Sequence, residues 1–211
     1  MNKGFKIAII STLLLFSLIG YFFYTNSLNS PSEYISIETA KKELVQYIET
    51  INKMEEQVFK YVDEEEAELA YLKTNSDIEL KYADKKGVLE FFLATIALKD
   101  VDLFLESFDL YAISGDIHSS PEKNKDLVIE DLMTQLSRDG LLVKLGYKEV
   151  KGKFGADSNT VKVTFFYSDG LEATIPISFA KTHDHHNGEE VYSISTSVLE
   201  MLKDIKSNSK S

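Results

Sequence analysis

The hydrophobic pattern divides the chain into an apolar N-terminal segment, a helical middle part and a C-terminal part in which apolar and polar residues alternate. Residues 5–24 hold a single charge, Lys6, and about twenty apolar residues suffice for a helix to cross the hydrocarbon core of a membrane. Positive charge before this segment and an aromatic cluster at residues 21–24 predict a cytoplasmic N-terminus and an extracytoplasmic remainder. A cleaved signal peptide is the alternative, although its apolar region is usually shorter and ends in small residues. We therefore expect an uncleaved anchor within residues 1–30 and a single-pass protein of the cell membrane.

After a short polar linker that contains Pro31, apolar residues recur at spacings of three, four and seven across residues 33–73, which predicts one long amphipathic helix. Such a helix is either a stalk that pairs with an envelope protein or a second copy, or a helix packed along its own domain. Lys41, Glu55 and Glu65 interrupt the stripe and favour packing. The stripe consists of Ile37, Leu44, Ile48, Ile51, Val58, Val62, Leu69 and Leu72.

The longest nearly unbroken apolar stretch after the linker, residues 88–108, predicts the centre of the fold. Residues 88–98 are apolar on all sides, which is typical of a buried helix. At about 100° per residue, the apolar side chains of residues 101–108 fall on the opposite side. We therefore place a break at Lys99-Asp100, with Asp100 as the N-cap of a second short helix whose first turn donates backbone N–H groups to its carboxylate.

Turn-forming residues divide the next part of the chain. Residues 111–117, around Gly115, are expected to form a short strand or an irregular loop. Ser120 and Pro121 are typical of an N-cap and a first helical residue, and Gly140 is typical of a helix end. The helix between them is expected to face the core with Val128, Leu132, Met133 and Leu136.

The period of the pattern then changes to two, which predicts antiparallel strands. Residues 141–153 are expected to form a strand that is bent or bulged at Gly146. Residues 161–167 and 171–179 alternate on either side of an Asp169-Gly170 dipeptide, which is a strong signal for a hairpin with a two-residue turn.

The strand that contains Pro176 should lie at an edge or be bulged there, because proline has no N–H to donate. Residues 191–197 are expected to form the last strand and residues 198–206 a closing helix. Together these elements predict an α+β fold, in which a transmembrane helix and a long amphipathic helix precede helices packed on a curved antiparallel sheet. The expected division is residues 1–30 for the cytoplasmic stub and anchor, 31–76 for the stalk or packing helix, 77–206 for the α+β domain and 207–211 for a disordered tail.

This order of elements, with the phrase FFLATIALKDVDLFLESF at residues 91–108, resembles the NTF2-like (cystatin-like) superfamily over about residues 81–197. The resemblance implies a cavity between helices and sheet that binds a small molecule or carries catalysis. Behind a single membrane anchor, such a domain is also similar to the VirB8-like subunits of bacterial secretion and conjugation machines. Candidates for lining the cavity are Phe92, Phe104, Phe165 and Ile175.

Composition excludes some chemistry. The chain has no Cys, so disulfides, thiolate nucleophiles and Cys-ligated zinc are absent. The net charge is -11, and an acidic protein repels phosphate backbones, so we expect no nucleic-acid partner. No nucleophile elbow, phosphate-binding loop or dinucleotide fingerprint occurs, so no catalytic residue and no cofactor is expected.

A histidine cluster is the only dense group of possible metal ligands. His183, His185 and His186, with Asp184, offer donors that suit zinc, nickel or copper. They lie in a polar segment between two strands, where a solvated hairpin loop is the simpler interpretation, so no metal is expected. Asp100 and Asp102 suit an acid and base pair in a pocket, although capping and solvent exposure explain them more simply.

These observations favour a non-catalytic, membrane-anchored extracytoplasmic domain that binds other proteins through residues 33–73, as a subunit of a bacterial envelope assembly. The alternative is a small-molecule-binding or catalytic domain with the cavity described above. If the long helix is a stalk, deletion of residues 32–73 should abolish association while the remainder still folds.

Overall fold

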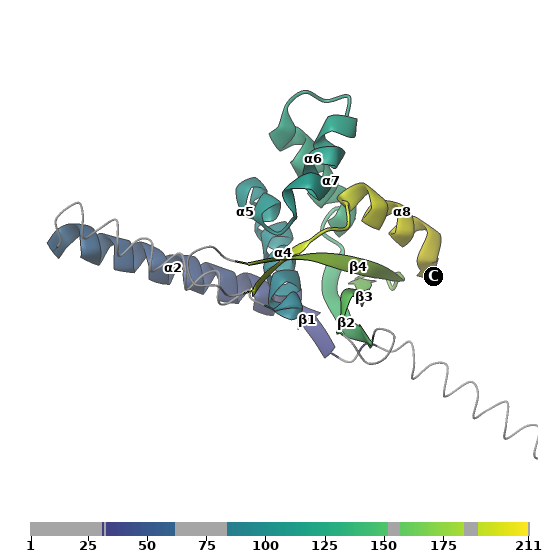
Figure 1. Cartoon of the computed structure of the whole chain (residues 1–211), viewed down its shortest axis with the longest axis horizontal. Helices are drawn as coiled ribbons and strands as arrows, with labels where there is room; N and C mark the ends of the chain where they lie inside the picture. The colour runs from purple at the N-terminus through teal and green to yellow at the C-terminus, as the bar shows by residue number, and fades with distance from the viewer. Residues whose placement is uncertain (1–30, 32, 62–83, 152–156, 184–189, 211) are drawn as a thin grey trace, which may run out of the picture.

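The computed structural model describes residues 31, 33–61, 84–151, 157–183 and 190–210. It has an α+β fold in which helices pack on a curled antiparallel sheet, a half-barrel (Figure 1). Among the described helices, none combines the length and the apolarity that crossing a bilayer requires; the predicted anchor lies outside the described residues. The elements are β1 (Glu33–Ser36), α2 (Ile37–Tyr61), α4 (Lys85–Leu98), α5 (Val101–Glu106), α6 (Leu110–Ser119), α7 (Lys125–Ser137), β2 (Leu142–Lys151), β3 (Asp157–Tyr167), β4 (Glu172–His183), β5 (Glu190–Ile194), α8 (Val198–Asn208) and β6 (Ser209–Lys210).

The sheet has the order β1-β2-β3-β4-β5 with antiparallel neighbours, and β6 pairs with the start of β4. The predicted β3–β4 hairpin is confirmed, with Val163 opposite Ile175 and Phe165 opposite Ala173. All four side chains are buried in one core that the helices share. The alternating pattern therefore identifies the face of the sheet that the helices cover.

The turn of this hairpin has three residues, not the predicted two. The N–H of Tyr167 donates to the carbonyl of Leu171 at 3.0 Å, and the N–H of Gly170 donates to the carbonyl of Tyr167 at 3.0 Å. Gly170 has φ of 87°, which only glycine adopts without strain. Asp169 adds a bond by accepting the N–H of Leu171 at 3.1 Å. A turn followed by a left-handed glycine is the usual closure of a three-residue hairpin loop.

Gly146 lies in a part of β2 with regular pairing, so the bulge predicted there is wrong. It pairs with Tyr34 of β1 and Thr164 of β3, and the register of β2 shifts only nearer its two ends. A Cβ at this position would lie 2.5 Å from Cγ of Pro31, which is closer than non-bonded carbon atoms approach. Glycine is required here because the ring of Pro31 packs directly against this position.

β1 occupies the start of the segment that periodicity assigned to the long helix. Ile35 of β1 is only 3% exposed, and pairing with β2 extends the sheet. α2 begins at Ile37 and buries Ala40 and Leu44, packing against α4. For its first turns, α2 is therefore packed along its own domain, one of the two uses predicted for this helix.

The predicted break between two central helices is confirmed. α4 is buried on nearly all sides, Lys99 takes a left-handed φ of 57°, and the Asp100 carboxylate accepts the N–H of Leu103 at 3.0 Å. The break turns α5 back toward α4, so the ring centroids of Phe92 and Phe104 lie 5.7 Å apart. The two helices thus contribute to one aromatic core.

α6 corrects the strand or loop predicted for residues 111–117. Asp109 caps this helix by accepting the N–H of Tyr111 at 3.0 Å. Ile113 and Asp116 are buried, and α6 contacts α7 and α8. Tertiary contacts therefore outweigh the weak helix propensity of the Ser-Gly-Asp sequence in its middle.

α7 begins later than predicted. Ser120 is the C-cap of α6, and Asn124, not Ser120, is the N-cap of α7. Pro121 lies in the connection, where its missing N–H costs no helical bond. The four residues predicted for the core face are all buried. The helix ends at Ser137, shortly before Gly140.

The last elements differ from the prediction mainly in length. β4 continues to His183, four residues past the predicted end at residue 179, and β5 ends at Ile194, three residues before the predicted end at residue 197. β5 pairs with β4 only from Phe179 onward, so Pro176 lies where no described strand covers that side, as predicted.

The closing helix is confirmed as α8, but the chain after it is not a free tail. α8 continues to Asn208, and Ser209 and Lys210 pair with Ala173 and Glu172 of β4. The polar composition predicted fraying because the sequence does not show that a free edge of β4 is available.

Candidate protein-binding surface

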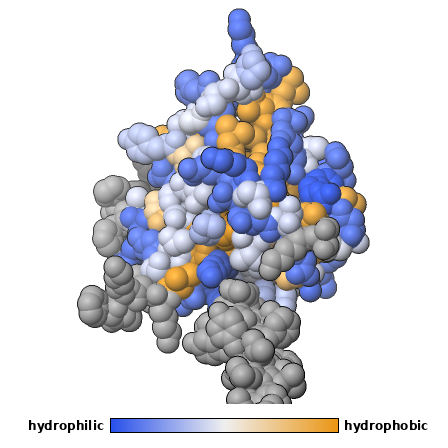
Figure 2. Space-filling model, turned by 90° about the vertical axis from the view of Figure 1, so that its right-hand side faces the viewer, coloured by the Kyte–Doolittle hydropathy of each residue, from blue (hydrophilic) through white to orange (hydrophobic). Residues whose placement is uncertain are grey.

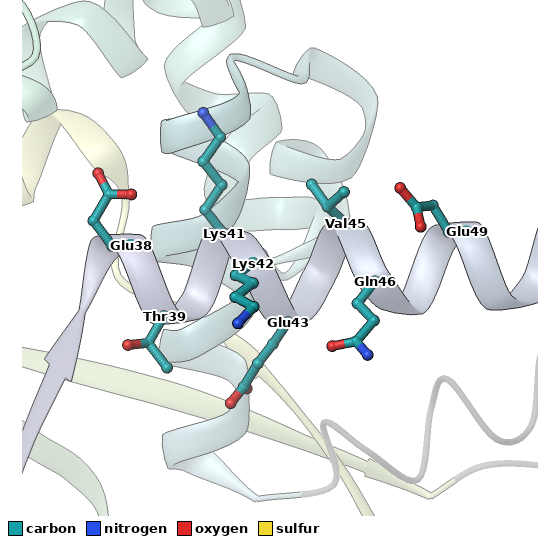
Figure 3. A pocket seen from close by; sticks show the side chains of 8 residues that line it. All are labelled: Glu38, Thr39, Lys41, Lys42, Glu43, Val45, Gln46 and Glu49. Carbon is teal, nitrogen blue, oxygen red and sulfur yellow. The ribbon is translucent and has the colours of Figure 1, made fainter.

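The exposed surface of α2 is the first candidate site. Figure 3 shows the side chains that line a pocket along this helix, and α2 supplies all of them. Lys41, Val45 and Glu49 lie on one side of the helix, and Thr39 and Gln46 lie on the other. Groups that diverge in this way cannot converge on one reacting atom. They can contact the surface of a larger partner.

α2 is longer than the part of it that packs on the core. It has 25 residues, which at about 1.5 Å per residue gives a length of about 37 Å. Among its side chains that the structure describes, which run to Lys53, Ile48 is the last that packs against the core, and Ile51 is half-buried. Figure 1 shows the C-terminal half of α2 extending beyond α4 and α5, away from the sheet.

The four residues predicted to line a cavity lie together in the core. Phe92, Phe104 and Phe165 are 0% exposed and Ile175 is 1% exposed, and they come from α4, α5, β3 and β4. The sequence therefore identified residues that the fold brings together between helices and sheet. Their role in lining a ligand cavity stays a prediction.

The histidine cluster lies mostly outside the described residues. His183 is the last residue of β4 and pairs with Glu190 of β5, while His185 and His186 fall between the described ranges. Within those ranges, no three His, Asp or Glu side chains are grouped so as to hold a metal ion. The expectation that this loop binds no metal therefore stays a prediction.

The two aspartates at the central break have separate positions. Asp100 uses its carboxylate to cap α5, and Asp102 is exposed in the first turn of the same helix. Partial burial, with the nearby charges of Asp100 and Asp102, raises the pKa of Glu106. A capping carboxylate that is already bonded to backbone is a poor general base, so capping is the better account of Asp100.

A second hollow, of about 490 Å³, lies where the start of α4 meets β1 and β2. Asp84 caps α4, and Lys85, 9% exposed, donates from Nζ to the carbonyl of Ser158 at 2.9 Å. Lys86 pairs with Glu33 at 2.8 Å. These groups bind one another across several elements, so they act in holding β1 and α4 together.

Asp116 is a buried carboxyl group that no sequence pattern indicated. It is 4% exposed, and its Oδ2 accepts the N–H of Val198, the first residue of α8, at 2.6 Å. Burial raises the pKa of Asp116, and hydrogen bonds from Val198 and Ser197 oppose that rise. The positive end of a helix favours a carboxylate, so Asp116 joins α6 to the start of α8.

Ser107→Ala is expected to stabilise the fold by about 1 kcal/mol. Ser107 is 1% exposed, and in the described part of the chain its Oγ has no hydrogen-bond partner. Alanine removes this unsatisfied hydroxyl and keeps the bond from the N–H of Ile194 to the Ser107 carbonyl. Thermal unfolding in mild detergent measures the change, with Ser119→Ala at the exposed end of α6 as the control. A lower melting temperature for Ser107→Ala would contradict the prediction.

Comparison of the chain with protein-family models, with curated proteins and with solved structures finds no match to any of them.

Proposed function

We propose that this protein is a membrane-anchored extracytoplasmic domain that binds other proteins and serves as a non-catalytic subunit of a bacterial envelope assembly. The observation that supports it best is the projection of the C-terminal half of α2 beyond α4 and α5 (Figure 1). In the sequence, the apolar stripe of this helix continues to Leu72. An apolar stripe on a projecting helix is suited to pairing with a partner helix.

Photocrosslinking of the full-length protein in its own membrane tests this proposal. A photoreactive residue at Ile51 replaces a half-buried position at the end of the packed part of α2, and the same residue at Lys53 provides the control. Two residues along a helix correspond to about 200° of rotation, so the two positions share a turn and differ in face. We expect one adduct of defined mass from Ile51 and little from Lys53, with mass spectrometry identifying the protein attached.

The outcomes of this experiment are distinct. An adduct with a second copy of the chain would identify self-association as the form of binding. Equal labelling from both positions, or none from either, would contradict binding through this face of α2. Deletion of residues 32–73 is a poor substitute, because it removes the buried side chains of Ile35, Ala40 and Leu44 together with β1.

The finer fold assignment is part of the same proposal. A curled antiparallel sheet with helices packed on one face, and a buried helix that breaks at Lys99-Asp100, support an NTF2-like domain related in arrangement to VirB8-like subunits.

The alternative function, a small-molecule-binding or catalytic domain, is supported by the gathering of Phe92, Phe104 and Phe165 between helices and sheet. Native purification from the membrane separates the two, because a stoichiometric protein partner favours the first and a bound small molecule favours the second.

A further inference from the structure

We draw no further inference here: the strongest candidate, the exposed apolar surface of the helices, which includes Leu110 and Tyr111 at the start of α6, carries none, because on the face seen in Figure 2 apolar residues reach the surface only in narrow strips between hydrophilic ones, and nothing in the structure shows what covers this surface.

Discussion

Phe104→Ala is expected to destabilise the domain by about 3–5 kcal/mol, the usual range for removing a buried phenylalanine ring. Phe104 is 0% exposed, and its ring centroid lies 5.7 Å from that of Phe92 and 5.0 Å from that of Phe108. Alanine at this position would remove the contacts of α5 with α4 and leave a cavity. Urea unfolding of the full-length protein in mild detergent, followed by circular dichroism, measures the loss.

Leu110→Ala is the control for this experiment. Leu110 is 74% exposed, so its truncation should change the free energy of unfolding by no more than about 0.5 kcal/mol. A loss below about 1 kcal/mol for Phe104→Ala would contradict a tightly packed core. That result would favour the alternative function, because a ring at the wall of an existing cavity has fewer contacts to lose. An apolar ligand should then raise the melting temperature of the parent protein.

Asp116→Ala is expected to destabilise the domain by about 1–3 kcal/mol, the cost of leaving a buried polar group without its partner. The variant leaves the N–H of Val198 without the acceptor that lies 2.6 Å away in Asp116. It also separates α6 from the N-terminus of α8. Thermal and urea unfolding measure this loss, and Asp116→Asn retains an acceptor oxygen and should lose less. Equal stability of Asp116→Ala and the parent protein would contradict the structural role.

The same carboxyl group predicts a pH dependence. Burial raises the pKa of Asp116 in the folded protein above the unfolded value of about 3.9. The folded state therefore binds the proton more tightly, so the stabilising contribution is complete below about pH 3.9 and is lost as pH rises through the folded pKa. We expect the stability of Asp116→Asn relative to the parent protein to increase as the pH rises from about 3.9, the unfolded pKa, toward neutral pH. A constant difference over that range would contradict the raised pKa, and Asp139→Asn at an exposed position is the control.

The candidate residues were only partly accessible from sequence. The rings of Phe92 and Phe104 were predicted to line a cavity between helices and sheet, and the structure places both in one core, where they are fully buried. Asp116 and Lys85 gave no signal, because each is a polar residue whose burial depends on a distant partner, Val198 and Ser158 respectively. Gly146 did give a signal in the sequence, but a glycine within a strand indicates a bulge and a close approach of another residue equally well.

Local chemistry determined the existence and position of several elements. The alternation on either side of Asp169-Gly170 predicted the β3–β4 hairpin, because a period of two defines a buried face wherever one side of a strand is covered. Opposed apolar faces and a capping aspartate at position 100 predicted the break between α4 and α5. In each case the information lies within a few residues of the feature itself.

The remaining features were decided by tertiary structure. Residues 33–36 were included in the predicted long helix, but β2 offers them an edge, and Ile35 is buried in the strand that pairs there. α6 forms around Gly115 because Ile113 is buried in the core and Asp116 bonds to α8. Likewise, Ser209 and Lys210 are ordered by a free edge of β4. The sequence by itself determined the apolar segments, their periods and the cap at Asp100. The free edges and distant partners that settled the short polar segments exist only once the chain has folded, because their free energy comes from contacts between residues far apart in the chain.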